Sequence, residues 1–111
     1  GVYQAAKDGG KLAVGVDSNQ NYMHPGTMLT SMLKRVDVAA YNAFSEVMND
    51  TWAPGFKVLG LAEAGVGWAL DEHNESLITP EMQEAVSAAS ASIVAGDISV
   101  HDYMSDNSCT Y

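Results

Sequence analysis

Cationic residues are scarce in this 111-residue chain, which has five Lys plus Arg against fourteen Asp plus Glu and a formal net charge of −9. Because binding to phosphate backbones depends on clustered cations, we do not expect a nucleic-acid partner. Cys109 is the single cysteine, so no internal disulfide can form. No His or basic cluster stands beside it in the sequence to activate its thiol, and thiol catalysis is therefore not expected.

Long apolar runs and familiar catalytic patterns are also missing. No run approaches the roughly 18 apolar residues of a membrane span. No basic start followed by an apolar middle is present either, so an exported protein would carry its targeting segment outside this chain. His24, His73 and His101 lack the spacing of metal ligands, and no Gly-x-Ser-x-Gly elbow or phosphate-binding loop occurs. We expect no enzyme activity, no metal and no cofactor.

What is present indicates one small folded domain, because 47% of the residues are hydrophobic and only 17% are charged. Strand-like and helix-like segments alternate with short connections, which favours an α/β fold with a mostly parallel sheet flanked by helices. Helices are predicted for residues 2–7, for 35–50 with apolar residues at helical spacing, and for 80–95 between a Thr79-Pro80 start and Gly96. Strands are predicted for residues 11–16, 27–32 (or a strand running into a helix), 56–61 with 65–70 pairing back on it, and 98–100.

The segment from Leu12 to Lys34 carries the clearest candidate for a binding site. A short apolar strand ends abruptly at Asp17, and a second apolar run delivers Lys34. Ligands of open α/β sheets lie outside the carboxyl ends of the strands, where Asp17 is expected. A carboxylate accepts hydrogen bonds from hydroxyls and an ammonium donates them, so the two side chains suit vicinal hydroxyls of a sugar. A structural ion pair, or two separate solvated charges, is the alternative.

Two other polar stretches are less specific. Asn19 and Gln20 lie in the run that follows Asp17 and could contact the same ligand, although such runs are usually turn residues. Asp71 and Glu72 form an acidic pair in a polar loop, for which a solvated surface is the simpler interpretation.

The chain resembles the basic membrane protein family, which comprises extracytoplasmic solute-binding lipoproteins of ABC transporters. The resemblance is carried by GVDSNQ at residues 15–20, LTSMLKRVD at 29–37 and GLAEAGVG at 60–67, in that order and at these separations. It implies part of a Rossmann-like lobe of a type I periplasmic binding protein. It also implies a non-enzymatic receptor that binds a purine nucleoside by closure of two lobes and passes it to a membrane permease.

The same resemblance assigns roles and boundaries to this chain. It implies that Asp17 and Lys34 reach the ribose of the nucleoside. Residues 1–100 correspond to a fragment of the C-terminal lobe and residues 101–111 to a polar tail, in a protein that is periplasmic or otherwise extracytoplasmic and membrane-anchored at full length. A free sugar as ligand, or a ligand-sensing regulatory lipoprotein of the same fold, are the alternatives. We also expect the incomplete sheet to favour self-association.

Overall fold

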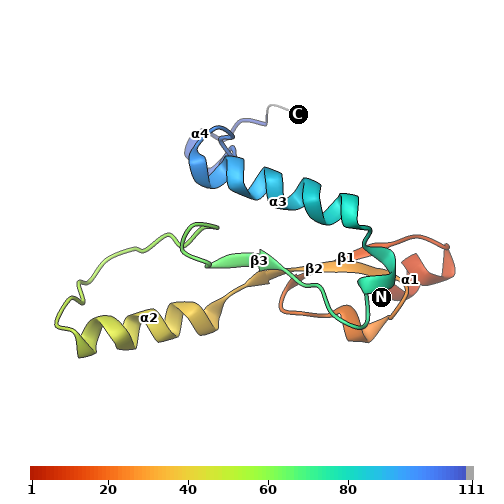
Figure 1. Ribbon diagram of the computed structural model, residues 1–111, viewed down its shortest axis with the longest axis horizontal. Coiled ribbons are helices and arrows are strands. Elements are labelled where there is room, and N and C mark those ends of the chain that lie inside the picture. Colours follow the sequence, from red (N-terminus) through yellow and green to blue (C-terminus); the bar gives the residue numbers. More distant parts are fainter. Residues whose placement is uncertain (110–111) are drawn as a thin grey trace.

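A three-stranded sheet in the order β1-β2-β3 is the centre of the computed structural model, which describes residues 1–109 (Figure 1). Strand β1 (Ala13–Asp17) runs parallel to β2 (Met28–Lys34), with Asp17 opposite Leu33. Strand β3 (Val66–Trp68) runs antiparallel to β2, with Val66 opposite Lys34. The α/β fold is therefore confirmed, but the sheet is mixed, and only its β1–β2 pair is parallel.

The helices follow the sequence signals closely. Helix α1 (Val2–Asp8) precedes β1, α2 (Val36–Met48) follows β2, and α3 (Pro80–Ala95) follows β3. The Thr79 hydroxyl accepts a hydrogen bond from the Met82 N–H, Pro80 is the first helical residue, and Gly96 ends α3 in the left-handed conformation. Short 3-10 turns, η1 (Asn21–Met23) and η2 (Glu75–Leu77), lie in the two longer polar connections.

Two predicted strands are wrong. Residues 56–61 form neither strand nor helix, and the Phe56 and Val58 side chains project into solvent. The strand at Val66–Trp68 pairs with β2 and not with this segment. Residues 98–100 are likewise not a strand. Strand propensity is realised only beside a neighbouring strand, and within residues 1–109 no strand lies beside either segment.

The predicted polar tail contains a short helix, α4 (Tyr103–Asp106). The Asp102 carboxylate caps it by accepting a hydrogen bond from the Met104 N–H, and Asn107 ends it in the left-handed conformation. Residues 110 and 111 of that tail lie outside the described residues.

Much apolar surface is left uncovered. Helix α2 leads away from the sheet and a long irregular segment returns the chain to β3, while α3 lies over the sheet (Figure 1). The accessible surface is 8153 Å², whereas a compact monomer of this mass exposes about 5,900 Å². The radius of gyration is 17.0 Å, against roughly 13 Å for a compact domain of this length. The chain folds locally but does not close a core of its own.

None of the helices within residues 1–109 is both long enough and apolar enough to cross a membrane.

Candidate functional site

Asp17 and Lys34 lie side by side at the carboxyl edge of the parallel pair. Asp17 is the last residue of β1 and Lys34 the last of β2, and the Lys34 Nζ is 2.9 Å from the Asp17 Oδ1. Each side chain is 63% exposed. The structure thus brings the two predicted residues together as a solvent-accessible ion pair and not as a pair sealed in a core.

The backbone of Asp17 adopts a conformation that is uncommon for a residue with a side chain. Its φ is +81°, in the left-handed region. This value lets the chain turn sharply out of β1 while the carboxylate stays beside Lys34. Asp tolerates the conformation better than most residues, but it still costs on the order of 1 kcal/mol relative to extended backbone.

Gln20 is held by the protein on all of its polar groups. Its backbone N–H donates to the Ser31 Oγ at 3.0 Å, its Nε2 donates to the Val16 carbonyl at 2.6 Å, and its Oε1 accepts from the Tyr3 hydroxyl. The side chain therefore fastens the loop to both β1 and α1. Gly15 makes room for this packing, because a Cβ there would lie 2.5 Å from the Ser31 Oγ.

Asn19 is also engaged within the chain. Its Nδ2 donates to the Asp71 Oδ2 at 2.6 Å, and its Oδ1 accepts from the Asn21 backbone N–H at 3.0 Å. The fully buried Asn21 side chain donates to the same Asp71 oxygen at 3.0 Å and accepts from the Ser31 Oγ–H at 2.8 Å. Two of the four predicted site residues, Asn19 and Gln20, therefore make structural contacts around the exposed pair.

Asp71 is fixed in turn to the central strand. Its backbone N–H donates to the Asn74 Oδ1 at 2.8 Å, and the buried Asn74 Nδ2 donates to the carbonyls of Leu29 at 2.8 Å and Ala69 at 3.0 Å. The hydrogen bond from Asn19, followed by those from the His73 N–H and Asn21, holds the pKa of Asp71 below its usual range, against the opposing effect of burial. Asp71 is a carboxylate at neutral pH.

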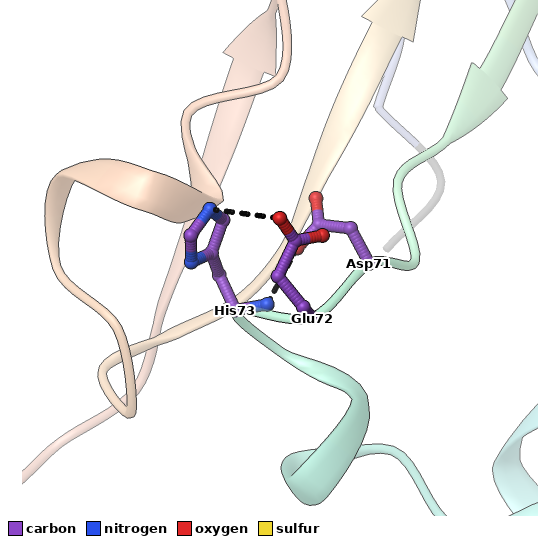
Figure 2. Close-up of side chains that lie close together, drawn as sticks. All are labelled: Asp71, Glu72 and His73. Atoms are coloured by element: carbon purple, nitrogen blue, oxygen red, sulfur yellow. Dashed lines mark hydrogen bonds and ion pairs between the residues drawn. The ribbon is translucent and has the colours of Figure 1, made fainter.

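The neighbours of Asp71 form a small cluster on the same loop. Figure 2 shows the His73 imidazole turned toward the Glu72 carboxylate, and Asp71 joined to the His73 backbone nitrogen. The potential metal-ligating atoms of Asp71, Glu72 and His73 lie within 4.8 Å of one another. Both Asp71 oxygens already accept hydrogen bonds, however, and Glu72 is largely exposed. We therefore assign Asp71 to the polar network and not to a metal site.

This network is the part of the site that sequence reasoning missed. The sequence favours solvated surface for Asp71 and a turn or ligand contact for Asn21, and it indicates no hydrogen-bonding role for Ser31 or Asn74. The available signal was an Asp followed three residues later by an Asn in a turn, a pattern that closes many exposed loops. Nothing in that pattern indicates contact with a loop some fifty residues earlier.

Neither Asp17 nor Lys34 lines the main apolar hollows. One of about 380 Å³ separates α3 from the sheet, and another of about 440 Å³ continues past Trp68. Trp68 lines both, as a partly buried residue and not as an exposed ring beside Asp17. The lining of the first hollow is Leu29, Thr30, Trp68, Ile78, Met82 and Val86.

Comparison with a solved structure identifies the fold of this chain. The chain is similar to an ABC transporter solute-binding protein from Aeropyrum pernix K1, with a TM-score of 0.69 and 24% identity over 90% of this chain and 36% of that one. The likeness establishes the fold as that of a solute-binding protein.

The family follows from the sequence itself. The family model described as "ABC transporter substrate-binding protein PnrA-like" matches residues 1–103, and the chain belongs to this family. It is 44% identical to an uncharacterized lipoprotein of Pyrococcus abyssi over 64% of this chain and 19% of the relative. It is 35% identical to basic membrane protein D of Borreliella burgdorferi over 68% of this chain and 24% of the relative. The chain thus spans about a fifth to a quarter of the length of these relatives.

Proposed function

We propose that this chain supplies one wall of a purine nucleoside site in an extracytoplasmic, lipid-anchored solute receptor that serves an ABC permease. Asp17 and Lys34 bind the ribose hydroxyls, and no covalent chemistry takes place. Support for the class comes from the family match and the fold. The names of the relatives, lipoproteins and basic membrane proteins, support the anchored, extracytoplasmic location.

The exposed Asp17–Lys34 ion pair is the observation that carries the proposal. Two side chains that are each 63% exposed gain at most about 1 kcal/mol from pairing in water. A pair this weak does little for stability, yet the Asp17 carboxylate that forms it is carried by a residue in the left-handed conformation. We interpret the pair as a preformed recognition group. On binding, hydroxyls of the ligand become the hydrogen-bond partners of the Asp17 carboxylate and the Lys34 ammonium.

The two charges match the chemistry of a vicinal diol. The Asp17 carboxylate accepts from two hydroxyl protons, and the Lys34 ammonium donates to a hydroxyl oxygen without accepting. Both groups stay near their bound positions in the absence of ligand, which reduces the entropy lost on binding. A second lobe closing over this wall completes the site and excludes water.

A titration of the ¹⁵N-labelled 111-residue chain tests the proposal at the residues concerned. Because only one wall is present, we expect dissociation constants of about 1–10 mM, within reach of chemical-shift mapping. Inosine and free ribose should shift the backbone signals near Asp17 and Lys34, and hypoxanthine, which lacks the sugar, should not. A response to hypoxanthine alone would contradict recognition of the ribose.

Matched variants assign the effect to the pair. Asp17→Ala and Lys34→Ala should each abolish the ribose-dependent shifts. Asp37→Asn is the control, because it removes the neighbouring exposed ion pair of Arg35 and Asp37, which has an N···O distance of 2.8 Å, and should leave the affinity unchanged. Ribose-dependent shifts that persist in both Ala variants would overturn the proposed role of these residues.

A further inference from the structure

We propose that Asp71 is a positioning residue of the ligand site: it clamps the loop that leaves β1 and thereby holds the Asp17 carboxylate beside Lys34. Asp71 touches no ligand in this scheme. The inference rests on the proposed function of Asp17 and Lys34, and it adds a residue that lies 54 positions beyond Asp17 in the sequence.

The clamp consists of two side-chain hydrogen bonds to one carboxylate oxygen. The Asp71 Oδ2 accepts from Asn19 at 2.6 Å and from Asn21 at 3.0 Å. Asn19 is two residues after Asp17, so its position largely determines how the chain can leave the strand. Asn21 is fully buried, which fixes the far side of the same turn.

A second anchor restrains the loop from the strand side. The Gln20 side chain donates to the carbonyl of Val16, the residue immediately before Asp17, at 2.6 Å. Hydrogen bonds therefore restrain the backbone on both sides of Asp17: the Gln20 side chain holds Val16 before it, and the Asn19–Asp71 contact holds the loop after it. If one of these two hydrogen bonds is lost, the backbone of Asp17 is free to relax from its φ of +81° toward the extended region. The carboxylate would then leave Lys34.

Asp71 is itself held rigidly enough to act as a clamp. Its backbone N–H is bonded to the Asn74 side chain, which donates to the Leu29 carbonyl in β2. Lys34 ends the same strand. One strand therefore carries both the cation of the site and, through Asn74 and Asp71, the support for the acid.

The clamp requires a carboxylate and not merely a polar side chain. The Asp71 Oδ2 faces two amide donors, and its Oδ1 faces the His73 N–H donor at 2.8 Å. An Asn at position 71 would have to place its NH₂ group against a donor, whichever way the amide is turned. The isosteric substitution Asp71→Asn is therefore a specific probe that leaves the volume of the side chain unchanged.

Reciprocal exchange of Asn19 and Asp71 tests the proposal. Asp71→Asn should weaken the affinity for inosine and ribose about tenfold, because a charge-assisted clamp is lost. Asn19→Asp should weaken it at least as much, because two carboxylates would then face each other. The double exchange Asn19→Asp with Asp71→Asn restores the donor–acceptor pair between positions 19 and 71, and should recover at least about threefold of the loss. Recovery is partial because the Asn21 Nδ2, which donates to the Asp71 Oδ2 in the wild type, has no acceptor at position 71 in the double variant.

The readout separates positioning from general stability. Affinity is measured by chemical-shift titration of the folded chain, and the melting temperature is measured in parallel. Glu72→Gln is the control, since it removes the adjacent exposed carboxylate and should change neither quantity. A lower melting temperature with unchanged affinity in Asp71→Asn would overturn the inference, and so would a double exchange that binds no better than the single variants.

Asp17→Asn distinguishes failure of this inference from failure of the proposed function. If Asp17→Asn abolishes binding while Asp71→Asn leaves the affinity unchanged, Asp71 is not a positioning residue and the proposed function stands. If Asp17→Asn has no effect on ribose binding, the site itself is elsewhere and both proposals fail.

Discussion

Two regions of the molecule differ in how well their side chains are partnered. One is the sheet with its polar loops, and the other is the arm, formed by α2 and residues 49–64. In the first region, loops 18–26 and 69–74 are tied to β1 and β2 by side-chain hydrogen bonds, and Asn21, Ser31 and Asn74 are fully buried. Within residues 1–109 no buried side-chain nitrogen or oxygen lacks a partner. In the arm, Phe44 and Met48 are exposed on a helix whose apolar spacing is typical of a buried face.

The difference shows which parts of the structure depend on this chain alone. Polar groups in the first region find their partners within residues 1–109, so its geometry is defined by the chain itself. On the arm, Ala39 and Ala43 line a hollow with Trp52 and Leu59, but Phe44, Val47 and Met48 stay exposed among the described residues. Self-association through the edge of the incomplete sheet stays a prediction, and size-exclusion chromatography at several concentrations would contradict it by showing a strict monomer.

The sharpest test of the comparison is deletion of apolar volume in each region. Met28→Ala should lower the free energy of unfolding by about 3 kcal/mol, because Met28 is fully buried in β2. Phe44→Ala removes a larger side chain from the arm but should cost less than about 0.5 kcal/mol, because that ring is exposed. Chemical denaturation measures both. Equal losses in the two variants would show that the arm is packed in solution and would remove the distinction.

A pair of glycines tests whether the polar loop is as tightly packed as its hydrogen bonds indicate. In Gly15→Ala the new Cβ would lie 2.5 Å from the Ser31 Oγ and 3.2 Å from the Gln20 Cβ, so we expect a loss of about 2 kcal/mol in stability. Gly67→Ala in β3 is the control, because no atom lies within 4 Å of the corresponding Cβ. If thermal unfolding shows no difference between the two variants, the loop yields more easily than the structure implies.

The sequence predicted the elements whose signals are local. The start of α3 at Thr79-Pro80 and its end at Gly96 were predicted correctly, because capping depends on neighbouring residues only. The strand predicted at Phe56–Leu61 failed because a strand needs a partner that its own sequence does not supply.

In the candidate site, too, the residues with local sequence signals could be predicted, and those that depend on distant contacts could not. Asp17 and Lys34 could be predicted, since each follows an apolar strand and parallel strands align their carboxyl ends. Asp71 could not, because its role depends on a contact with Asn19 across 52 positions. Hydrogen bonds between loops far apart in sequence leave no periodicity to detect.

Asp17→Gly tests whether function and stability conflict in the ordered region. Glycine adopts a φ of +81° without strain, so the variant should gain roughly 0.5–1 kcal/mol from relief of the backbone, less the small contribution of the exposed ion pair. Ribose binding should be lost, because the acceptor is gone. Thermal unfolding and the chemical-shift titration together give the result. A variant that is clearly destabilised would show that the left-handed backbone of Asp17 carries no strain.

Acid should loosen the polar network, although this effect is the smallest. Because the folded-state pKa of Asp71 is lowered from its ordinary value of 3.8, its contribution to stability is present above pH 4 or so and is lost as the pH falls through the folded pKa. The groups facing the carboxylate are the amides of Asn19 and Asn21 and the His73 backbone. The electrostatic interaction with His73 also lowers the pKa of Asp71.

Other carboxylates contribute to acid unfolding, so a difference between variants isolates Asp71. Arg35 lowers the pKa of Asp37 to about 2 by hydrogen bonding, and Asp37 lies at the start of the arm helix, outside the network. The wild-type chain should therefore lose more stability between about pH 5 and pH 2 than Asp71→Asn does, whereas Asp37→Asn should alter the acid response without changing hydrogen exchange of the Asn19 and Asn21 amides. If Asp71→Asn keeps the full acid sensitivity of the wild type, the carboxylate does not hold the two loops together, and the ordered region owes its rigidity to Gln20 and Asn74 alone.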